Sequence, residues 1–318
     1  MKKLLCMIVV AAFAMMALSV SAQDRPTAVL QHGNSPKVFY GPDAFVSAFA
    51  EAQAGDLISL SLGNFNVPAK IDKTLKIQGS GHNTVLNAAL TVEGTDAIDG
   101  FWLEGVCGGN LNLKGTMNNT TIQRCRFTGT VSVDAAGENC LFIQSLVYKM
   151  SYPGNMAGLD INNCIIAGHL WFGNAVMNLP SVHNCYIEAL KADTYKEYAR
   201  GSYTNCIIKT FSQCNKSLLI FSNVICTTTA NEEMNLENYT KLSSTEFEAL
   251  FAEKELRTLT EAAASQYIGS DGTQIGAYGG QTPFTKIPAI PQITMSNFGT
   301  ATNADGKLPV TIKVEVNN

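Results

Sequence analysis

The sequence is poor in charged residues and in histidine, and it lacks closely spaced cysteine pairs. Only 15% of the 318 residues are charged, and 4 are histidine. No CxxC pair occurs, so the spacing typical of structural zinc sites is missing. Beyond residue 23 no apolar run is long enough to cross a bilayer. We therefore expect no metal site, no cofactor and no membrane span in the processed chain.

Positive charge is also scarce. The chain has 22 basic and 26 acidic residues, and loss of Lys2 and Lys3 with the N-terminal segment leaves 20 basic residues against 26. A surface of this sign repels a phosphate backbone, which argues against a nucleic-acid partner. What the chain has instead is 46% hydrophobic residues and 26 glycines. This composition favours a large buried core with frequent turns.

The N-terminal segment has the features of an export signal. Two lysines precede an apolar stretch, and small residues follow at Val20-Ser21-Ala22. The pattern predicts a signal peptide over residues 1–22 and a mature chain that starts at Gln23, with a retained membrane anchor as the alternative. The expected location is therefore secreted, periplasmic or on the outer cell surface.

A short pattern recurs through the middle of the chain at intervals near 20 residues. An asparagine–cysteine pair returns at Cys164, Cys185 and Cys206, each time 21 residues later. In every copy an apolar residue stands three positions before the cysteine, and another stands two positions after it. In the remaining copies the equivalents of the cysteine are Phe101, Cys125, Ser145 and Asn223.

This period predicts a solenoid in which every repeat forms one coil. The leucine consensus of leucine-rich repeats is absent, so we predict a parallel β-helix whose coils stack about 4.8 Å apart. Residues one period apart then become neighbours in space. Small side chains at the cysteine position can stack on their own kind inside a narrow core.

The position before each cysteine predicts a corner of the coil. Asparagine tolerates left-handed backbone, and its amide can hydrogen-bond up and down the stack. The predicted structural ladder comprises Cys125, Cys164, Cys185 and Cys206 in the core, with Asn163, Asn184 and Asn205 at the corner.

Of the 9 cysteines, all but Cys6 lie beyond the predicted signal. An exported protein can form disulfides, but Cβ atoms stacked about 4.8 Å apart are too distant for an unstrained bridge. We expect buried free thiols, with a disulfide among Cys140, Cys214 and Cys226 as the alternative.

Three stretches resemble a known family. "GDLISLSLGNFNV" and "KTLKIQGSG" look like the opening coil of secreted right-handed parallel β-helix proteins of the pectate-lyase-like superfamily. "ASQYIGSDGTQIGAYGG" resembles the last-coil motif of exported Bacteroidetes-type members, although Ala264-Ser265-Gln266 lacks the proline of the usual Ser-Pro step. The resemblance covers residues 38–285 and implies the fold rather than an activity.

Both ends of a solenoid need a cover. "GPDAFVSAFAEAQAGD" predicts a capping helix with Asp43 at its N-cap and Gly55 after its end. Ser243 and Glu246 predict a capping box that opens a second short helix. The expected fold is an all-β, right-handed parallel β-helix solenoid with an N-terminal capping helix and a short β tail. The expected segments are an N-terminal segment with the capping helix over 23–55, the β-helix over 56–285 with a helical insertion over 231–264, and a linker and β tail over 286–318.

The resemblance raises polysaccharide cleavage as an activity, which requires clustered acidic residues or an Arg or Lys base. The aspartates between residues 96 and 226 do not share a position in neighbouring coils, so no paired carboxylates are visible. Weak catalytic candidates are Arg126, Asp160 and His169. Their competing interpretation is as ordinary surface or corner residues.

The position after each cysteine should point outward. It is mostly apolar, with Arg126, Leu146, Ile165, Tyr186, Ile207 and Val224 in successive coils. Such a stripe suits cover by the C-terminal tail, a partner protein or a glycan. The candidate binding residues are Arg126, Trp171, Tyr186 and Tyr203.

These features favour an exported, non-catalytic β-helix protein that is adhesin-like, or that binds a glycan, an envelope protein or a host protein at the cell envelope. One alternative is a polysaccharide lyase or glycoside hydrolase acting on an acidic, pectin-like polysaccharide. Another is a purely structural envelope component.

Overall fold

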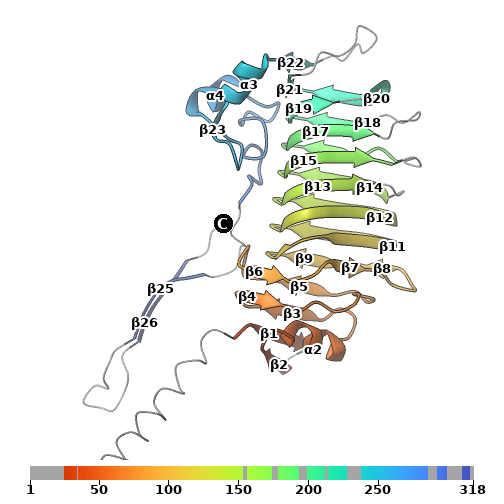
Figure 1. The fold of residues 1–318 in the computed structure, drawn as a ribbon, viewed down its shortest axis with the longest axis vertical. Coiled ribbons are helices and arrows are strands. Elements are labelled where there is room, and N and C mark those ends of the chain that lie inside the picture. The colour runs from red at the N-terminus through yellow and green to blue at the C-terminus, as the bar shows by residue number, and fades with distance from the viewer. Residues whose placement is uncertain are drawn as a thin grey trace, which may run out of the picture.

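The computed structural model describes residues 25–33, 35–152, 156–173, 178–192, 199–211, 214–227, 238–285, 292–298 and 310–315. The predicted signal peptide over 1–22 lies outside these residues. The described chain is mostly β and forms a parallel solenoid of about 7 turns, as Figure 1 shows. The predicted all-β parallel solenoid is therefore confirmed.

The solenoid is built from short strands that follow one another along the chain. Their bounds are β1 Thr27–His32, β2 Ser35–Tyr40, β3 Leu57–Leu60, β4 Gly63–Phe65, β5 Lys76–Gln78, β6 Thr84–Leu86, β7 Leu90–Val92, β8 Ile98–Asp99, β9 Trp102–Glu104, β10 Cys107–Gly108, β11 Leu111–Gln123, β12 Arg126–Ile143, β13 Leu146–Tyr152, β14 Met156–Asn162, β15 Ile165–Phe172, β16 Ser181–His183, β17 Tyr186–Ala192, β18 Ala199–Thr204, β19 Ile207–Phe211, β20 Cys214–Ser222, β21 Val224–Cys226 and β22 Tyr239–Lys241. The described helices are α2 Ala44–Glu51, α3 Ser244–Ala249 and α4 Glu261–Gln266, and two small hairpins consist of β23 Phe251–Glu253 with β24 Thr258–Leu259 and of β25 Gln292–Phe298 with β26 Val310–Glu315.

Each coil has strands on either side of a sharp corner. Before the corner, β14, β16 and β18 pair in parallel, and Ile161, Val182 and Tyr203 are direct partners. After the corner, β15, β17 and β19 pair in the same way. Strand alternation turns Ile161, Val182 and Tyr203 inward, and each is 0% exposed.

The corner residue has a left-handed backbone in successive coils. Asn163, Asn184 and Asn205 have φ angles of 49°, 48° and 55°. Asparagine suits this conformation because its short polar side chain can hydrogen-bond locally. We refer to this column as the asparagine corner, and its members are Arg124, Gln144, Asn163, Asn184, Asn205 and Asn223.

The cysteine column lies next to the corner, inside the core. Cys125, Cys164, Cys185 and Cys206 are each 0% exposed. The Cys164 amide donates to Cys185 Sγ over 3.3 Å, so these residues sit on adjacent coils. Burial raises the pKa of the Cys185 thiol well above its ordinary value.

The cysteines of the described residues are free thiols. These are Cys107, Cys125, Cys140, Cys164, Cys185, Cys206 and Cys226. Cys140 and Cys226 therefore do not form the alternative disulfide with each other, and the side chain of Cys214 lies outside the described part.

The repeat containing Asn223 has a different register from the predicted one. The sequence pattern puts Asn223 at the cysteine position, but Ile225 pairs with Ile207, which gives that position to Val224. Asn223 instead lies at the corner with a φ of 60°. Its Nδ2 donates to Asn205 Oδ1 over 3.2 Å, so asparagine chemistry decides the register here.

The upstream copy is also shifted. The sequence pattern puts Phe101 at the cysteine position, but Leu103 pairs with Ile122 and Cys107 pairs with Arg126. Val106 therefore occupies the cysteine position in this coil, and Cys107 occupies the outward position that follows it. The cysteine-column prediction for Phe101 was wrong because apolar spacing alone does not distinguish the two registers.

A second left-handed corner was not anticipated from the sequence. Asn119, Asn139 and Gly158 have φ angles of 51°, 60° and 63°. The Asn139 amide donates to Asn119 Oδ1 over 3.0 Å, and the Asn119 amide donates to Asp99 Oδ1 over 2.8 Å. This polar ladder joins successive coils where the chain re-enters the strands that precede the asparagine corner.

Helix α2 lies at the first-coil end of the stack (Figure 1). Phe45 and Ala48 are 0% exposed, as the apolar face of the predicted helix requires. Asp43 occupies the N-cap but makes no capping hydrogen bond. Its carboxylate accepts from Asn66 Nδ2 over 2.7 Å instead.

Residues 242–284, which we refer to as the clasp, lie along the side of the solenoid. They contain α3, the β23–β24 hairpin and α4. The predicted capping box at Ser243 and Glu246 is present, with both of its hydrogen bonds formed. The stretch after α4 resembles a last-coil motif in sequence. In the structure it lies against the asparagine corner, to which it is hydrogen-bonded, and it does not stack as a further coil.

The clasp runs backwards along that corner, one coil at a time. Asn163 shows the contact most fully, because its Nδ2 donates to Ala277 O over 2.9 Å and to Gly279 O over 2.7 Å, while Thr282 Oγ1 donates to its Oδ1 over 3.0 Å. The other contacts join Asn223 to Ile268, Asn205 to Ser270, Asn184 and Asn205 to Asp271, and Gln144 to Pro283.

The predicted tail strand is present as β26. It pairs with β25 in an antiparallel hairpin, which forms a two-stranded sheet separate from the solenoid sheet. Figure 1 draws this hairpin away from the stack of coils.

Substitution of Asn163 should destabilise the protein strongly, because Asn163 is 1% exposed and holds three hydrogen bonds to the clasp. We expect Asn163→Ala to lower the free energy of unfolding by about 2–4 kcal/mol. Asn163→Gly should cost about 1 kcal/mol less, since glycine adopts the left-handed backbone freely. Urea denaturation measures both values.

The exposed Asn64 makes no side-chain hydrogen bond to another described residue, and Asn64→Ala is the matched control, with a change below about 0.5 kcal/mol. Equal stability of Asn163→Ala and this control would contradict the role of the corner amide.

Thiol labelling should distinguish the cysteines. The thiolate is the reactive form, and burial raises the pKa of Cys125 and of Cys140 to about 12. We expect iodoacetamide at pH 8 to modify the half-buried Cys107 in the native protein before either of these, as measured by peptide mass spectrometry. Modification of Cys125 or Cys140 at the rate found in urea would show that the core around these thiols is open to solvent.

Candidate functional site

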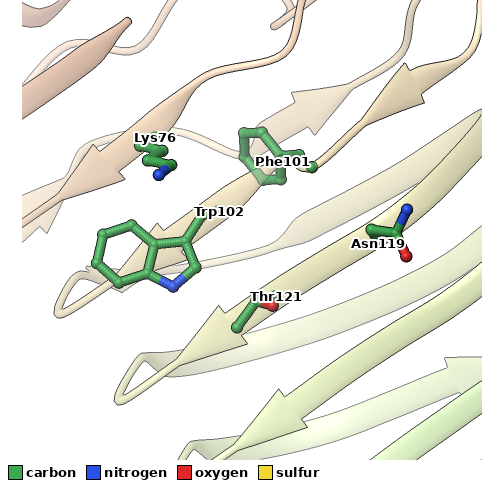
Figure 2. A pocket seen from close by; sticks show the side chains of 6 residues that line it. Lys76, Phe101, Trp102, Asn119 and Thr121 are labelled. Carbon is green, nitrogen blue, oxygen red and sulfur yellow. The ribbon is translucent and has the colours of Figure 1, made fainter. Parts of the chain in front are cut away.

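An open hollow lies on the strands that precede the asparagine corner, near the N-terminal end. Its volume is about 230 Å³. Figure 2 shows Lys76, Trp102 and Thr121 on neighbouring strands, with Phe101 and Asn119 beside them. The lining comes from β5, β9, β11 and the link between β8 and β9, and consists of Lys76, Gly100, Phe101, Trp102, Asn119 and Thr121.

Strand alternation explains why an indole faces outward here. Phe101 and Leu103 are both 0% exposed, so Trp102 between them must point away from the core. The strand register then sets its neighbours, because Trp102 pairs with Lys76 on one side and with Thr121 on the other. The hollow therefore presents an aromatic surface between an ammonium group and a hydroxyl group.

Polar groups around the hollow are fixed by hydrogen bonds. Asn119 donates to Asp99 Oδ1 over 2.8 Å at the second corner. On the other flank, Arg124 Nη1 and Glu104 Oε1 form an ion pair at 2.7 Å, and Glu104 is only 3% exposed. Gln78 Nε2 also donates to Glu104, over 3.3 Å. Of these polar residues, Asn119 lines the hollow itself, and the Glu104 contacts lie two residues further along the same strands.

Sequence reasoning did not single out Trp102. The sequence did contain a signal for it. Trp102 is one of 2 tryptophans in the chain, and it stands between two apolar residues of a predicted strand that should both face inward. The predicted register, with Phe101 at the cysteine position, also puts Trp102 at the outward position, but the outward stripe was followed only from Arg126 onward.

The three weak catalytic candidates belong to different parts of the coil. Asp160 lies on β14, before the asparagine corner, whereas Arg126 begins β12, after it. His169 lies further along β15, beyond a register shift in the pairing with β13. No hydrogen bond or ion pair joins any two of them within the described residues, so the structure does not assemble them into one site.

Asp160 and His169 have perturbed environments of different kinds. Burial raises the pKa of Asp160, and the nearby His183 partly offsets this. Asp160 Oδ1 has no hydrogen-bond partner among the described residues. Burial also lowers the pKa of His169, with further lowering by the positive charges of Lys149 and Lys191. A histidine in this setting stays neutral at physiological pH.

The aromatic binding candidates are mostly interior. Tyr203 is 0% exposed, and its hydroxyl donates to Arg200 O over 3.0 Å, so the structure places it in the core. Tyr186 is 1% exposed. Trp171 is half-buried on β15 and pairs with Ser151 and Lys191.

The outward apolar column is covered by the clasp. Ile165, Tyr186, Ile207 and Ile225 are at most 2% exposed and share one core with clasp residues such as Phe251. From the sequence we expected the C-terminal tail as one candidate cover for this stripe, whereas the residues packed against it in the structure belong to the clasp. In the last of these coils the outward position is occupied by Ile225, and not by Val224 as the sequence pattern predicted.

A network of ion pairs joins the clasp to the solenoid at the edge of this stripe. Arg257 Nη2 lies 2.9 Å from Glu188 Oε2, and its guanidinium stacks over the Tyr186 ring at 4.7 Å. Lys209 Nζ lies 2.8 Å from Glu188 Oε1 and 3.0 Å from Glu248 Oε1. The Tyr186 hydroxyl also donates to Glu188. A single solenoid carboxylate thus joins two cations and a phenol.

No group of three or more His, Cys, Asp or Glu side chains in the described ranges is arranged to hold a metal ion. Within the same ranges, no helix has the length and apolar character needed to span a membrane.

Comparison with known proteins gives no match. No family model, no curated protein and no solved structure is significantly similar to this chain.

The ionic network should make stability depend on pH. The hydrogen bond from Lys209 lowers the pKa of Glu248 below 4.5. A lowered folded-state pKa contributes stability above the unfolded value, and this contribution is lost as the pH falls through the folded-state pKa. We expect the free energy of unfolding to fall below pH 4.5, and Glu248→Gln to reduce that dependence, as followed by urea denaturation at each pH.

Glu253→Gln, on β23 of the same clasp, is the matched control, because the exposed Glu253 forms no ion pair with another described residue. If both variants keep the pH dependence of the parent protein, the Glu248 contact does not stabilise the clasp.

Proposed function

We propose that this chain is an exported, non-catalytic β-helix protein of the pectate-lyase-like superfamily that binds glycan at the cell envelope. The observation that carries the proposal is the outward-facing Trp102 in an open hollow, with Lys76 and Thr121 beside it in register. The N-terminal signal pattern and the opening-coil resemblance support export and the superfamily.

The chemistry of the hollow suits a sugar ring. An indole offers a large, rigid apolar face, and the C–H face of a pyranose packs on such a surface while its hydroxyls stay at the edges. Lys76, Asn119 and Thr121 supply donors and acceptors at those edges. The hollow is open rather than enclosed, which fits one or two residues of a longer chain.

A binding role agrees better with the candidate residues than catalysis does. Polysaccharide cleavage needs an acid and a base, or a nucleophile, on the two sides of one bond. Arg126, Asp160 and His169 lie in different parts of the coil, and Asp160 is the only one of them with a carboxyl group. Adhesion through a bound glycan follows from this surface, with an envelope or host polysaccharide as the partner.

Tryptophan fluorescence tests the glycan-binding proposal directly. Trp171→Phe leaves Trp102 as the single indole, so its emission reports on the hollow. We expect envelope and plant polysaccharides, screened on a glycan array, to include a ligand that shifts this emission saturably. Trp102→Ala should weaken that ligand at least tenfold, or about 1.4 kcal/mol.

Two controls decide between interpretations. Trp171→Ala removes the other indole and should leave affinity unchanged. Equal affinity of Trp102→Ala and the parent protein would refute binding in this hollow. Release of reducing ends or unsaturated products, abolished by Asp160→Asn or Arg126→Ala, would favour a polysaccharide lyase or glycoside hydrolase instead.

A further inference from the structure

A second hollow lies between the clasp and the solenoid, and it shares no residue with the Trp102 hollow. Its volume is about 180 Å³. Glu255 reaches it from the turn between β23 and β24. The solenoid side comes from β12, β13 and β15 and consists of Arg126, Phe127, Thr128, Leu146, Tyr148 and Ala167. The hollow therefore exists only because the clasp crosses the coils here.

The hollow holds two opposite charges that are not paired with each other. Neither Arg126 nor Glu255 forms an ion pair with any other described residue. This differs from the neighbouring clasp network, in which Arg257, Glu188 and Lys209 are all paired. The two charges are thus available to a ligand from opposite sides of one cavity.

An aromatic ring and an apolar floor complete the hollow. Tyr148 is 57% exposed, which is unusual for a large side chain on a solenoid strand. The face of such a ring attracts an ammonium group. Leu146 and Phe127 also line the hollow and add apolar surface. This surface accommodates the methylene or methyl groups of a small ligand.

We infer that this hollow binds a phosphate–ammonium zwitterion, the chemistry shared by phosphocholine and phosphoethanolamine groups. The Arg126 guanidinium matches a phosphate, to which it can donate two parallel hydrogen bonds. The ammonium then lies between the Glu255 carboxylate and the Tyr148 ring. A neutral sugar would leave both charges unpaired, and a simple anion would meet repulsion from Glu255, so a dipolar ligand fits best.

Such groups occur on lipids and as substituents of polysaccharides, and both sources present the same chemistry to the hollow. The inference does not depend on glycan binding at Trp102, since the two hollows are lined by different residues. If one hollow does not bind its proposed ligand, binding at the other hollow can still be tested separately.

Isothermal titration calorimetry of the purified protein tests the inference. We expect saturable binding of O-phosphocholine and O-phosphoethanolamine, and at least tenfold weaker binding of inorganic phosphate and of choline. Arg126→Gln and Glu255→Gln should each weaken phosphocholine at least tenfold, while Glu255→Gln should leave the weak phosphate affinity unchanged or increased. Lys254→Gln, next to Glu255 but outside the hollow, should bind as the parent protein does.

Two results would overturn the inference. One is the absence of saturable binding of either zwitterion. The other is equal phosphocholine affinity in Glu255→Gln and Lys254→Gln, which both change exposed residues of the same turn and should fold normally. Co-sedimentation with phosphatidylcholine vesicles identifies a lipid source, and binding of the soluble compounds without co-sedimentation identifies a non-lipid source; either result supports the chemistry.

Discussion

The structure depends on the in-register stacking of coils through the asparagine corner. A solenoid coil must turn sharply at the same position each time, and a left-handed backbone makes that turn. The buried polar groups created there need partners. Asn163, Asn184 and Asn205 meet both needs, since their backbones adopt the turn and their amides face the clasp. The fold and its lateral cover therefore depend on one position of the coil, which asparagine occupies in most of the coils that contact the clasp.

The candidate functional residues are the ones that depart from the repeat. Trp102 occupies a column in which the next coils have Thr121 and Leu141, and Arg126 occupies a column that continues as Leu146 and Ile165. The clasp covers the later coils of the second column and stops near Arg126. The Trp102 hollow lies on the N-terminal coils, which the clasp leaves open, whereas the second hollow lies where the clasp meets β12, β13 and β15.

The architecture was largely predictable from the sequence, because a solenoid converts sequence period into spatial contact. The asparagine–cysteine pairs predicted the corner and the cysteine column, and the spacing of Ser243 and Glu246 predicted the start of a helix. The register failed at Asn223 and Phe101, where two apolar phases fit equally well. The rule that asparagine favours left-handed backbone would have placed Asn223 correctly. The path of the clasp was not predictable, since contacts such as Asn163 with Ala277 join residues outside any shared period.

Sulfur positions from anomalous diffraction of crystals test the stacking most directly. The account predicts Cys164, Cys185 and Cys206 Sγ atoms in one row, each separated from the next by about the inter-strand distance of 4.8 Å. It also predicts that this row runs beside the asparagine corner. Sulfur atoms scattered through the core, or separated by two or more strand spacings, would contradict the in-register coil and with it the placement of both hollows.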